Sequence, residues 1–185
     1  MSTVSSTRTA VPAGTWSVDP AHSKVTFAVK HMGIANVRGE FTEVEGTLEV
    51  GEDLSSSKAY GMVTAQSVDT NEPQRDDHLR SPDFFDAAQY PELRFESTRI
   101  EALDDKEFRI TGNLTMHGIT KEVVFHADYQ GTDIDPWGGT RIGLEVTGQI
   151  NRSDWDMKFN QMLGSGNVMV ADKVKLEIDI SAVKQ

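Results

Sequence analysis

Residues 107–116, EFRITGNLTM, alternate strictly between two kinds of side chain. The odd-numbered residues are all polar or charged. The even-numbered residues are all apolar or glycine: Phe108, Ile110, Gly112, Leu114 and Met116. A period of two residues is typical of a β-strand with one buried and one solvated face. The segment therefore predicts an antiparallel strand that covers an apolar core.

The same period recurs along most of the chain. Residues 24–32, KVTFAVKHM, alternate in the same way. Further strands are predicted at residues 36–50, 58–68, 92–100, 122–129, 140–150 and 173–182. This makes about eight strands of roughly ten residues, and their short connections favour an antiparallel meander. One apolar face per strand predicts a barrel, which leaves no exposed edge, with a β-sandwich as the alternative.

The apolar pattern changes parity within residues 36–50. Before the change the apolar or glycine positions are odd-numbered, as at Phe41, and after it they are even-numbered, as at Val44. One extra residue near Thr42–Val44 would restore a single buried face. The sequence therefore predicts one long strand with a β-bulge at this point.

Residues 70–95, TNEPQRDDHLRSPDFFDAAQYPELRF, are the one part of the chain that favours helix. Asn71 is the expected N-cap of a first helical turn opened by Glu72 and Pro73. Residues 74–80, which contain no glycine or proline, continue it as a short helix. Ser81-Pro82 ends that helix, because the residue before a proline avoids the helical region. We therefore expect a short helical insertion between strands.

Within this insertion, a second turn is expected to carry the adjacent residues Phe84 and Phe85. Asp76 and Arg80 lie four residues apart, so a local ion pair is expected between them. We interpret the insertion as part of the barrel wall, with its phenylalanines facing the interior.

The length of 185 residues fits a single domain. We place it at residues 14–185, after a Ser/Thr-rich tail at residues 1–13 that is expected to be disordered. A secretory leader needs an apolar stretch of about 7–15 residues, and the tail contains none, so we expect a cytoplasmic protein.

Composition restricts the classes of partner. The formal net charge of −11 disfavours nonspecific binding to nucleic acid or to an anionic surface. No apolar run approaches the roughly 18 residues that span a bilayer, so stable membrane insertion is not expected. Cysteine is absent, which excludes disulfides and thiolate metal sites. These features fit a protein that handles a small molecule.

Glycine falls on the inward face of several strands. A barrel of eight strands either fills itself with side chains or holds one small ligand. A filled core would place larger side chains at the inward positions Gly39, Gly46, Gly112 and Gly148. The glycines therefore favour a ligand cavity.

Several separated motifs resemble the YceI-like family of lipocalin-type proteins. They are DPAHSKVTFAVKHMGIANVRGEF at residues 19–41, TNEPQRDDHLRSPDFFD at 70–86, YPELRFES at 90–97 and GNLTMHGITKEV at 112–123. RSDWDMKFN at 152–160 is similar to the family's Arg-x-Asp-Phe-Gly-Met region, with departures at Trp155 and Asp156. The resemblance covers nearly everything from Trp16 to the C-terminus.

This resemblance implies an all-β fold, an extended eight-stranded antiparallel lipocalin-like barrel with a short helical insertion between strands. It also implies a long apolar cavity, a carrier of polyisoprenoids or similar long-chain amphiphiles, and a homodimer. The expected ligand-binding residues are Phe27, Val29, His31, Met32, Phe41, Met62, His78, Phe84, Phe85, Phe95, Leu114, Met116, Phe125, Leu144 and Met162. Flexible methionines suit a flexible apolar tail.

The residues give little support to other chemistry. The histidines lack the spacing of a metal site, and there is no Gly-x-Ser-x-Gly motif, so no metal, cofactor or catalytic residue is expected. Two alternatives stay open: an enzyme acting on a lipid or isoprenoid through the Asp76–His78 region, and a stress-related interaction protein with a filled barrel. Arginines that are candidates for a pyrophosphate head group are Arg38, Arg75, Arg80 and Arg152.

The sequence therefore predicts a protein without enzymatic activity. It would bind, store or transport a long-chain isoprenoid or fatty-acid-like ligand, such as a quinone or a prenyl diphosphate.

Overall fold

The structure is a computed structural model that describes residues 9–185. Its strands are β1 (Gly14–Val18), β2 (Lys24–His31), β3 (Ala35–Phe41), β4 (Val44–Val50), β5 (Lys58–Thr64), β6 (Val68–Asp69), β7 (Glu92–Ala102), β8 (Glu107–Met116), β9 (Ile119–Ile134), β10 (Thr140–Asn151) and β11 (Val170–Lys184). The helix α1 (Pro73–Arg80) lies between β6 and β7, and the short 3-10 helices are η1 (Pro20–His22), η2 (Leu54–Ser56), η3 (Ala65–Ser67) and η4 (Arg152–Trp155).

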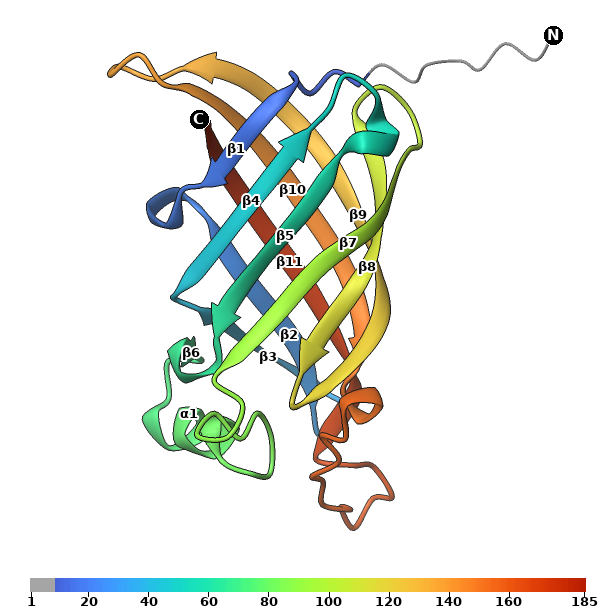
Figure 1. Ribbon diagram of the computed structural model, residues 1–185. Helices are drawn as coiled ribbons and strands as arrows, with labels where there is room; N and C mark the ends of the chain where they lie inside the picture. The colour runs from blue at the N-terminus through green and yellow to red at the C-terminus, as the bar shows by residue number, and fades with distance from the viewer. Residues whose placement is uncertain (1–8) are drawn as a thin grey trace, which may run out of the picture.

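Eight of the strands close into an antiparallel barrel (Figure 1). Their order is β1-β4-β5-β7-β8-β9-β10-β11, and β11 pairs with β1 to complete the ring. Alternating strands of this kind bury one face toward a common interior. The predicted all-β, eight-stranded antiparallel barrel with a short helical insertion is confirmed.

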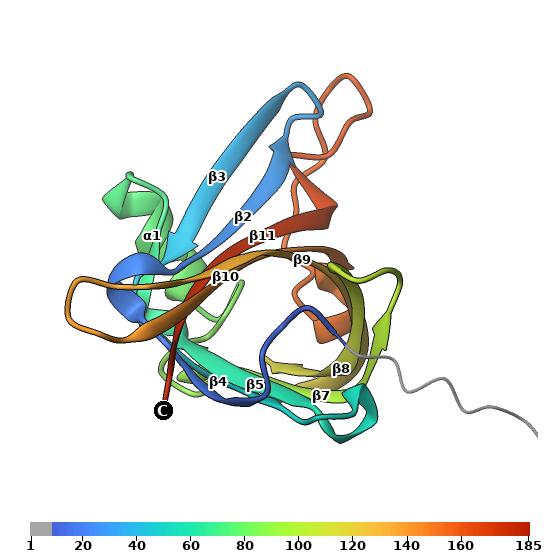
Figure 2. The same cartoon turned by 90° about the horizontal axis from the view of Figure 1, so that it is seen from above.

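The barrel is extended because two of its walls are each built from two successive strands. Along β11, Ala182 pairs with Val18 of β1, and Ile178 pairs with Val25 of β2. β2 pairs with β3, and β1 pairs with β4. The successive strands β3 and β4 therefore lie beside β2 and β1 and form the next wall. Seen from above, β2 and β3 project away from the ring that the other strands form (Figure 2). The lower half of the barrel therefore flares outward.

The predicted bulge near Thr42–Val44 is wrong in detail. The chain does not continue as one bulged strand, because the ladder stops at Thr42 and Glu43, and β3 and β4 have different partners. The amide of Thr42 donates to the carbonyl of Ser67, and the amide of Thr64 donates to the carbonyl of Glu43. The parity change is real, since Phe41 and Val44 are both buried. The residues between them bond to the last residue of β5 and to the segment after it instead of extending the ladder.

An apolar cluster fills the upper end of the barrel. Trp16 is fully buried there and packs with residues such as Phe108 and Ile142. The indole N–H of Trp16 donates to the carbonyl of Pro12, and Val11 is buried in the same cluster. Residues 9–13 therefore contact the barrel, although the sequence places them in the tail. Residues 1–8 of the predicted tail lie outside the described residues.

The helical insertion lies at the lower end (Figure 1). α1 begins one residue later than the predicted cap implies: Glu72, not Asn71, is the N-cap, and its side chain accepts from the amide of Gln74. Asn71 instead adopts a left-handed conformation with φ of 65°. Among residues 9–185, no helix is both long enough and apolar enough to cross a bilayer.

An ion-pair network ties the upper turns together. Arg141 Nη1 lies 2.8 Å from Asp19 Oδ2, and Arg141 Nε lies 2.8 Å from Asp135 Oδ2. The hydrogen bond from Arg141, and then that from His22, lowers the pKa of Asp19 from 3.8 to about 2. The same guanidinium lowers the pKa of Asp135. These carboxylates join the β1–β2 turn to β10 and to the β9–β10 hairpin.

We expect Arg141→Gln to destabilise the fold most near neutral pH. The folded-state pKa of Asp19 is lowered, so its contribution to stability is present above about 3.8 and is lost as the pH falls toward about 2. Urea denaturation across this range should show the difference from the wild-type free energy of unfolding shrinking as pH falls. Arg109→Gln is the control, because Arg109 makes no ion pair within residues 9–185. A difference that stays constant with pH would contradict the assignment.

Candidate functional site

A cavity of about 420 Å³ lies inside the barrel. Its wall is made almost entirely of apolar side chains from the inward faces of the strands, and residues of the helical insertion lie at its lower end. The volume falls within the range of small-molecule sites, which is about 300–1,000 Å³. A filled barrel, one of the alternatives that the sequence left open, does not fit this interior.

Most of the residues predicted to bind a ligand line this cavity. Those that do are Phe27, Val29, His31, Phe41, Met62, His78, Phe84, Phe85, Phe95, Leu114, Met116, Phe125 and Leu144. Met62 pairs with Glu45 and so shares the outward parity of β5, whose inward neighbours are Gly61 and Val63. Met62 therefore borders the cavity as part of the wall and does not point into it as its neighbour Val63 does.

The structure places Met32 and Met162 outside the cavity. Met32 follows the last residue of β2, where the alternation ends, and its positive φ of 56° turns the chain away. It is 39% exposed, and Met162, which pairs with Val168 in an isolated bridge, is 75% exposed. The predicted lining role of these two methionines is not supported, because alternation says nothing about residues beyond a strand end.

The inward glycines do not leave empty space of their own. Phe27 lies directly opposite Gly39, and Phe125 lies directly opposite Gly148 in the strand register. A Cβ built on Gly148 would lie 2.5 Å from Phe125 Cδ1, and one built on Gly39 would overlap the Phe27 ring. The rings therefore lie across the glycines, against the wall, which keeps the centre of the barrel open.

We expect Gly148→Ala to lower both stability and ligand capacity. The new methyl group would push the Phe125 ring toward the cavity, and overpacking of this kind costs about 1–3 kcal/mol. Chemical denaturation and a ligand titration measure the two effects. Gly164→Ala is the matched control, because no heavy atom lies within 4 Å of a Cβ built there. Equal effects of the two substitutions would show that the ring does not depend on the glycine.

Buried polar contacts fasten the helical insertion to the barrel. The Asp76 carboxylate is buried and accepts from the Thr70 amide at 2.8 Å and from its hydroxyl at 2.6 Å. Arg75 Nε donates to the same hydroxyl at 2.7 Å. The predicted ion pair of Asp76 with Arg80 is wrong: Arg80 pairs with Asp77 at 3.2 Å and also donates to the carbonyls of Gln66 and Val68. Asp76 therefore holds the start of the insertion, not its end.

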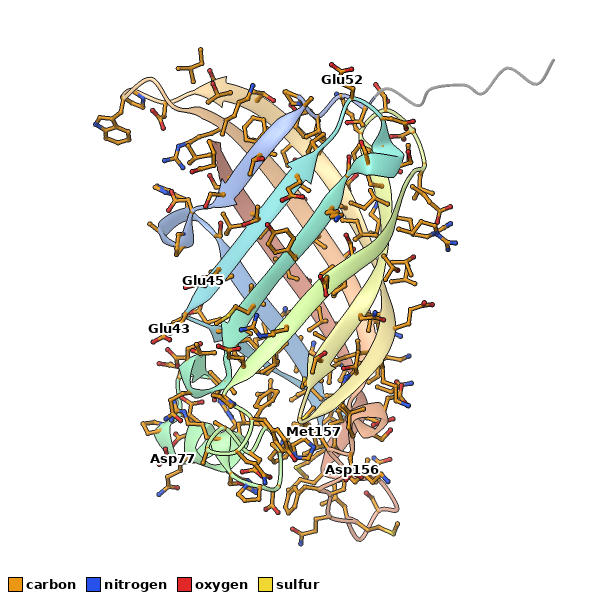
Figure 3. All side chains as sticks on the ribbon, in the orientation of Figure 1. Glu43, Glu45, Glu52, Asp77, Asp156 and Met157 are labelled. Atoms are coloured by element: carbon orange, nitrogen blue, oxygen red, sulfur yellow. The ribbon has the colours of Figure 1, made fainter. Side chains whose placement is uncertain are left out.

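Three rings meet at the lower end of the cavity. The ring centroids of His78 and Phe159 are 4.8 Å apart, those of His78 and Phe84 are 5.0 Å apart, and those of Phe84 and Phe159 are 5.4 Å apart. His78 and Phe84 come from the insertion, whereas Phe159 comes from the irregular segment before β11, whose residues Asp156 and Met157 are labelled at the lower end in Figure 3. The cluster joins two segments that are distant in the sequence.

Arg152 lies beside this ring cluster and is buried. Its guanidinium donates to the carbonyls of Met157, Ala171 and Val170 at 2.7, 2.9 and 3.1 Å, and lies 5.8 Å from the Phe84 ring centroid. Burial lowers the pKa of Arg152, and Asp172 opposes that shift. Of the arginines predicted to meet a pyrophosphate, Arg75 and Arg152 line the cavity, and Arg38 and Arg80 do not.

The residues of the enzyme alternative are engaged in other contacts. Asp76 accepts from Thr70, and His78 Nε2 lies 2.9 Å from Asp83 Oδ2. A general acid–base pair must reach a common proton or substrate atom. These contacts instead assign both residues to holding the insertion in shape.

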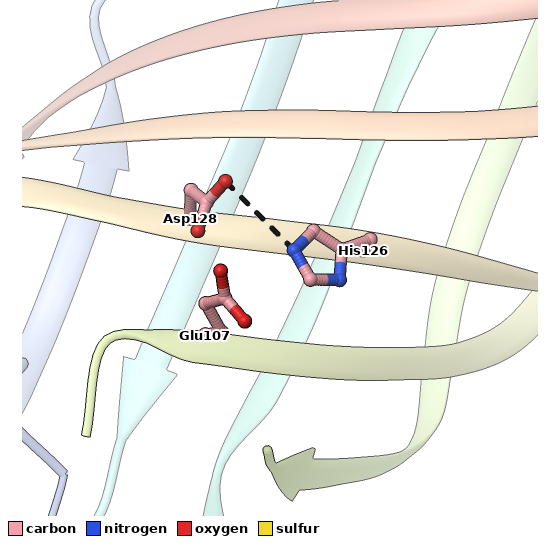
Figure 4. Close-up of side chains that lie close together, drawn as sticks. All are labelled: Glu107, His126 and Asp128. Atoms are coloured by element: carbon pink, nitrogen blue, oxygen red, sulfur yellow. Dashed lines mark ion pairs between the residues drawn. The ribbon is translucent and has the colours of Figure 1, made fainter. Parts of the chain in front are cut away.

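One group of potential metal ligands lies outside the cavity. Glu107, His126 and Asp128 lie close together on β8 and β9 (Figure 4), and their ligand atoms all lie within 4.8 Å of one another. His126 Nε2 and Asp128 Oδ2 lie 3.8 Å apart. All three are half-exposed, and none lines the cavity. The group has no part in the cavity's chemistry.

Several residues that line the cavity are absent from the predicted set. Val146 and Leu176 have the inward parity of predicted strands, so the alternation could have identified them. Phe159 and Met157 lie in a segment without any period, and nothing local indicates that they reach the cavity.

Known proteins have sequences similar to that of this chain. The sequence model of the YceI-like domain matches residues 16–182. Protein YceI of Escherichia coli is 38% identical over 165 residues, which cover 89% of this chain and 83% of that protein.

Solved structures share the fold. The crystal structure of Burkholderia cenocepacia BcnA has a TM-score of 0.77 at 21% identity, covering 89% of this chain and 98% of that one. The structure of a polyisoprenoid binding domain from Saccharophagus degradans, implicated in plant cell wall breakdown, has a TM-score of 0.70 at 14% identity, covering 92% and 98% of the two chains.

Proposed function

Because the chain belongs to the YceI-like family, we propose that it binds a single long-chain apolar ligand, a polyisoprenoid, in the barrel cavity. The observation that carries the proposal is the cavity of about 420 Å³ with its almost wholly apolar wall. The related polyisoprenoid binding domain supports the choice of ligand class. Residues 14–185 would act as one binding domain that carries or stores the ligand in the cytoplasm without catalysis.

The energetics of tail burial suffice for tight binding. Each methylene that leaves water contributes about 0.8 kcal/mol, so ten buried carbons contribute on the order of 8 kcal/mol before ordering costs. Affinities of non-covalent complexes saturate near −18 to −21 kcal/mol. Polar groups therefore need only orient the head of the ligand.

The polar lining favours a ligand with a neutral head group. His31, His78 and Thr70 line the cavity, and Lys30, which also borders it at the end of β2, is exposed. Arg75 is bonded to Thr70, and Arg152 is bonded to three carbonyls, so neither guanidinium is fully available to a phosphate. Binding a diphosphate would require these contacts to be exchanged. A quinone-like head needs only a hydrogen-bond donor for its carbonyl oxygen, and the imidazole of His31, which makes no side-chain hydrogen bond within residues 9–185, can supply one.

The direct test is native mass spectrometry of the purified protein, followed by organic extraction and identification of the lipid. We expect one lipid per chain. Titration with a quinone and with a prenyl diphosphate of equal tail length should then show tighter binding of the quinone. A protein that retains no lipid and binds neither compound would refute the proposal. Turnover of a bound isoprenoid that is lost in Asp76→Asn would favour the enzyme alternative.

A further inference from the structure

Four exposed apolar side chains gather at the flared end of the barrel. Met32, Ile34, Met162 and Val168 are 39%, 78%, 75% and 40% exposed, and we call them the apolar rim. They come from the β2–β3 turn and from the segment before β11, which lie side by side in both views (Figures 1 and 2). Isolated exposed apolar residues are ordinary, but a contiguous group marks an interaction site.

Backbone bonds hold the rim in a defined shape. The amide of Met32 donates to the carbonyl of Met169 at 2.8 Å, which fastens the two segments to each other. Within the second segment, Met162 pairs with Val168, and the amide of Leu163 donates to the carbonyl of Asn167 at 2.8 Å. The four side chains are therefore presented together by fixed turns.

The rim adjoins the ligand cavity. His31 and Met169 line the cavity, and their chain neighbours Met32 and Val168 belong to the rim. His31 also pairs with Val170, a further lining residue. The segments that carry the rim therefore also supply residues that line the cavity.

The two segments that carry the rim have a net charge opposite to that of the rest of the chain. Residues 30–38 and 160–170 contain Lys30 and Arg38 and no acidic residue. Both cations are exposed, and neither has an ion-pair partner in the part of the chain that the structure describes. The whole chain carries −11 and these segments +2, so the remainder carries −13.

We propose that the apolar rim docks onto the surface of an anionic lipid bilayer. This inference rests on the proposed function, because a polyisoprenoid is dissolved in membranes and must enter the cavity from one. Apolar side chains at the acyl boundary, with basic residues beside them at the phosphates, are the features of peripheral membrane attachment. The acidic remainder would be repelled from the same surface. The repulsion orients the cavity toward the lipid.

The test measures cosedimentation of the protein with vesicles of phosphatidylcholine mixed with phosphatidylglycerol, and with vesicles of phosphatidylcholine alone. We expect binding to the mixed vesicles that weakens with added salt. Ile34→Ser combined with Met162→Ser should reduce the partition coefficient by about tenfold or more. Lys30→Gln combined with Arg38→Gln should remove the preference for the anionic lipid.

The chain offers a matched control at its other end. Ile134 and Trp137 on the β9–β10 hairpin are 67% and 84% exposed, but they are flanked by Asp133 and Asp135. Ile134→Ser combined with Trp137→Ser should leave vesicle binding unchanged. An equal loss in this control, or no vesicle binding by the wild type, would overturn the proposal. Wild-type self-association that the rim variant abolishes, without vesicle binding, would assign the rim to a protein interface and would also overturn it.

A second measurement separates this proposal from the proposed function. The rim residues lie outside the cavity, so the Ile34→Ser, Met162→Ser variant should keep the wild-type affinity for a short-chain, water-soluble quinone. Its transfer of a long-chain quinone out of mixed vesicles should be slower by about tenfold. A wild-type protein that does not bind the short-chain quinone would refute the cavity function. Intact binding together with an unchanged transfer rate would refute only the docking surface.

Discussion

Phe84→Ala and Phe85→Ala are each expected to weaken the protein and its hold on ligand far more than Asp77→Ala. Phe84 is buried against His78, Phe159 and Arg152, and Phe85 packs edge-to-face on Phe41 with ring centroids 5.5 Å apart. Truncating a buried phenylalanine to alanine costs about 3–5 kcal/mol. Phe84 is buried more completely than Phe85, so its effect should be the larger.

Asp77 is the matched control for these substitutions, because it lies in the same insertion. Its side chain is 80% exposed and pairs with Arg80 at the surface, so its removal should cost no more than about 1 kcal/mol. Figure 3 shows Asp77 at the outside of the lower end. Denaturant unfolding gives the stability, and the off-rate of a bound fluorescent isoprenoid gives the retention. Similar effects from all three variants would contradict the view that the insertion closes the cavity with its phenylalanines.

Filling the cavity should weaken ligand binding strongly without unfolding the protein. Leu144 and Val29 line the cavity from β10 and β2, and neither belongs to a buried cluster of the core. Leu144→Trp combined with Val29→Trp would place two indoles in the space of the tail. Excluding about four methylenes of the tail removes about 3 kcal/mol of binding free energy, so we expect the Kd to rise by about a hundredfold. Isothermal titration with a quinone measures the change.

The control for this variant uses the outward neighbours of the same residues. Glu145→Trp combined with Ala28→Trp adds the same indoles to the outer face of β10 and β2, where they do not reach the cavity. Ligand affinity should stay at the wild-type value. A cavity variant that still binds with wild-type affinity would show that the ligand does not occupy the barrel interior.

Together these results would show whether the helical insertion serves as a wall of the cavity or as an active site. The helical insertion looks rich in acid–base chemistry, but Asp76, Arg75 and Thr70 bond to one another, and His78 packs in a ring cluster. Its polar groups stabilise the insertion, and its apolar groups face the cavity. What the cavity offers a ligand is therefore mainly apolar surface.

The sequence by itself determined the period of the strands, and the period determined the fold class. Alternation is a local property, because successive side chains of a strand point to opposite faces whatever the strand pairs with. It identified the inward positions, and among them most of the cavity lining, including Phe27, Phe95 and Phe125. The short helix and its two phenylalanines were also visible locally, from prolines and caps.

Only the tertiary structure determined which residues of different strands and helices lie opposite one another. The sequence indicated that Gly39 and Gly148 face inward, but only the register places Phe27 and Phe125 across them. The partner of Arg80 depended on how the helix sits against β6, and the break at Thr42 depended on the strands beside it. In each case the deciding contact joins separate elements, whose relative placement no local pattern encodes.

The lower end of the cavity shows the same division most clearly. Phe159 lies in a segment without period, yet barrel closure brings it to His78 and Phe84, which are distant in the chain. The exposure of Met32 and Met162 was likewise decided by where β2 ends and how the following turns meet. Local pattern determined which residues face inward along each strand. Closure of the barrel determined where the interior ends and which residues form its rim.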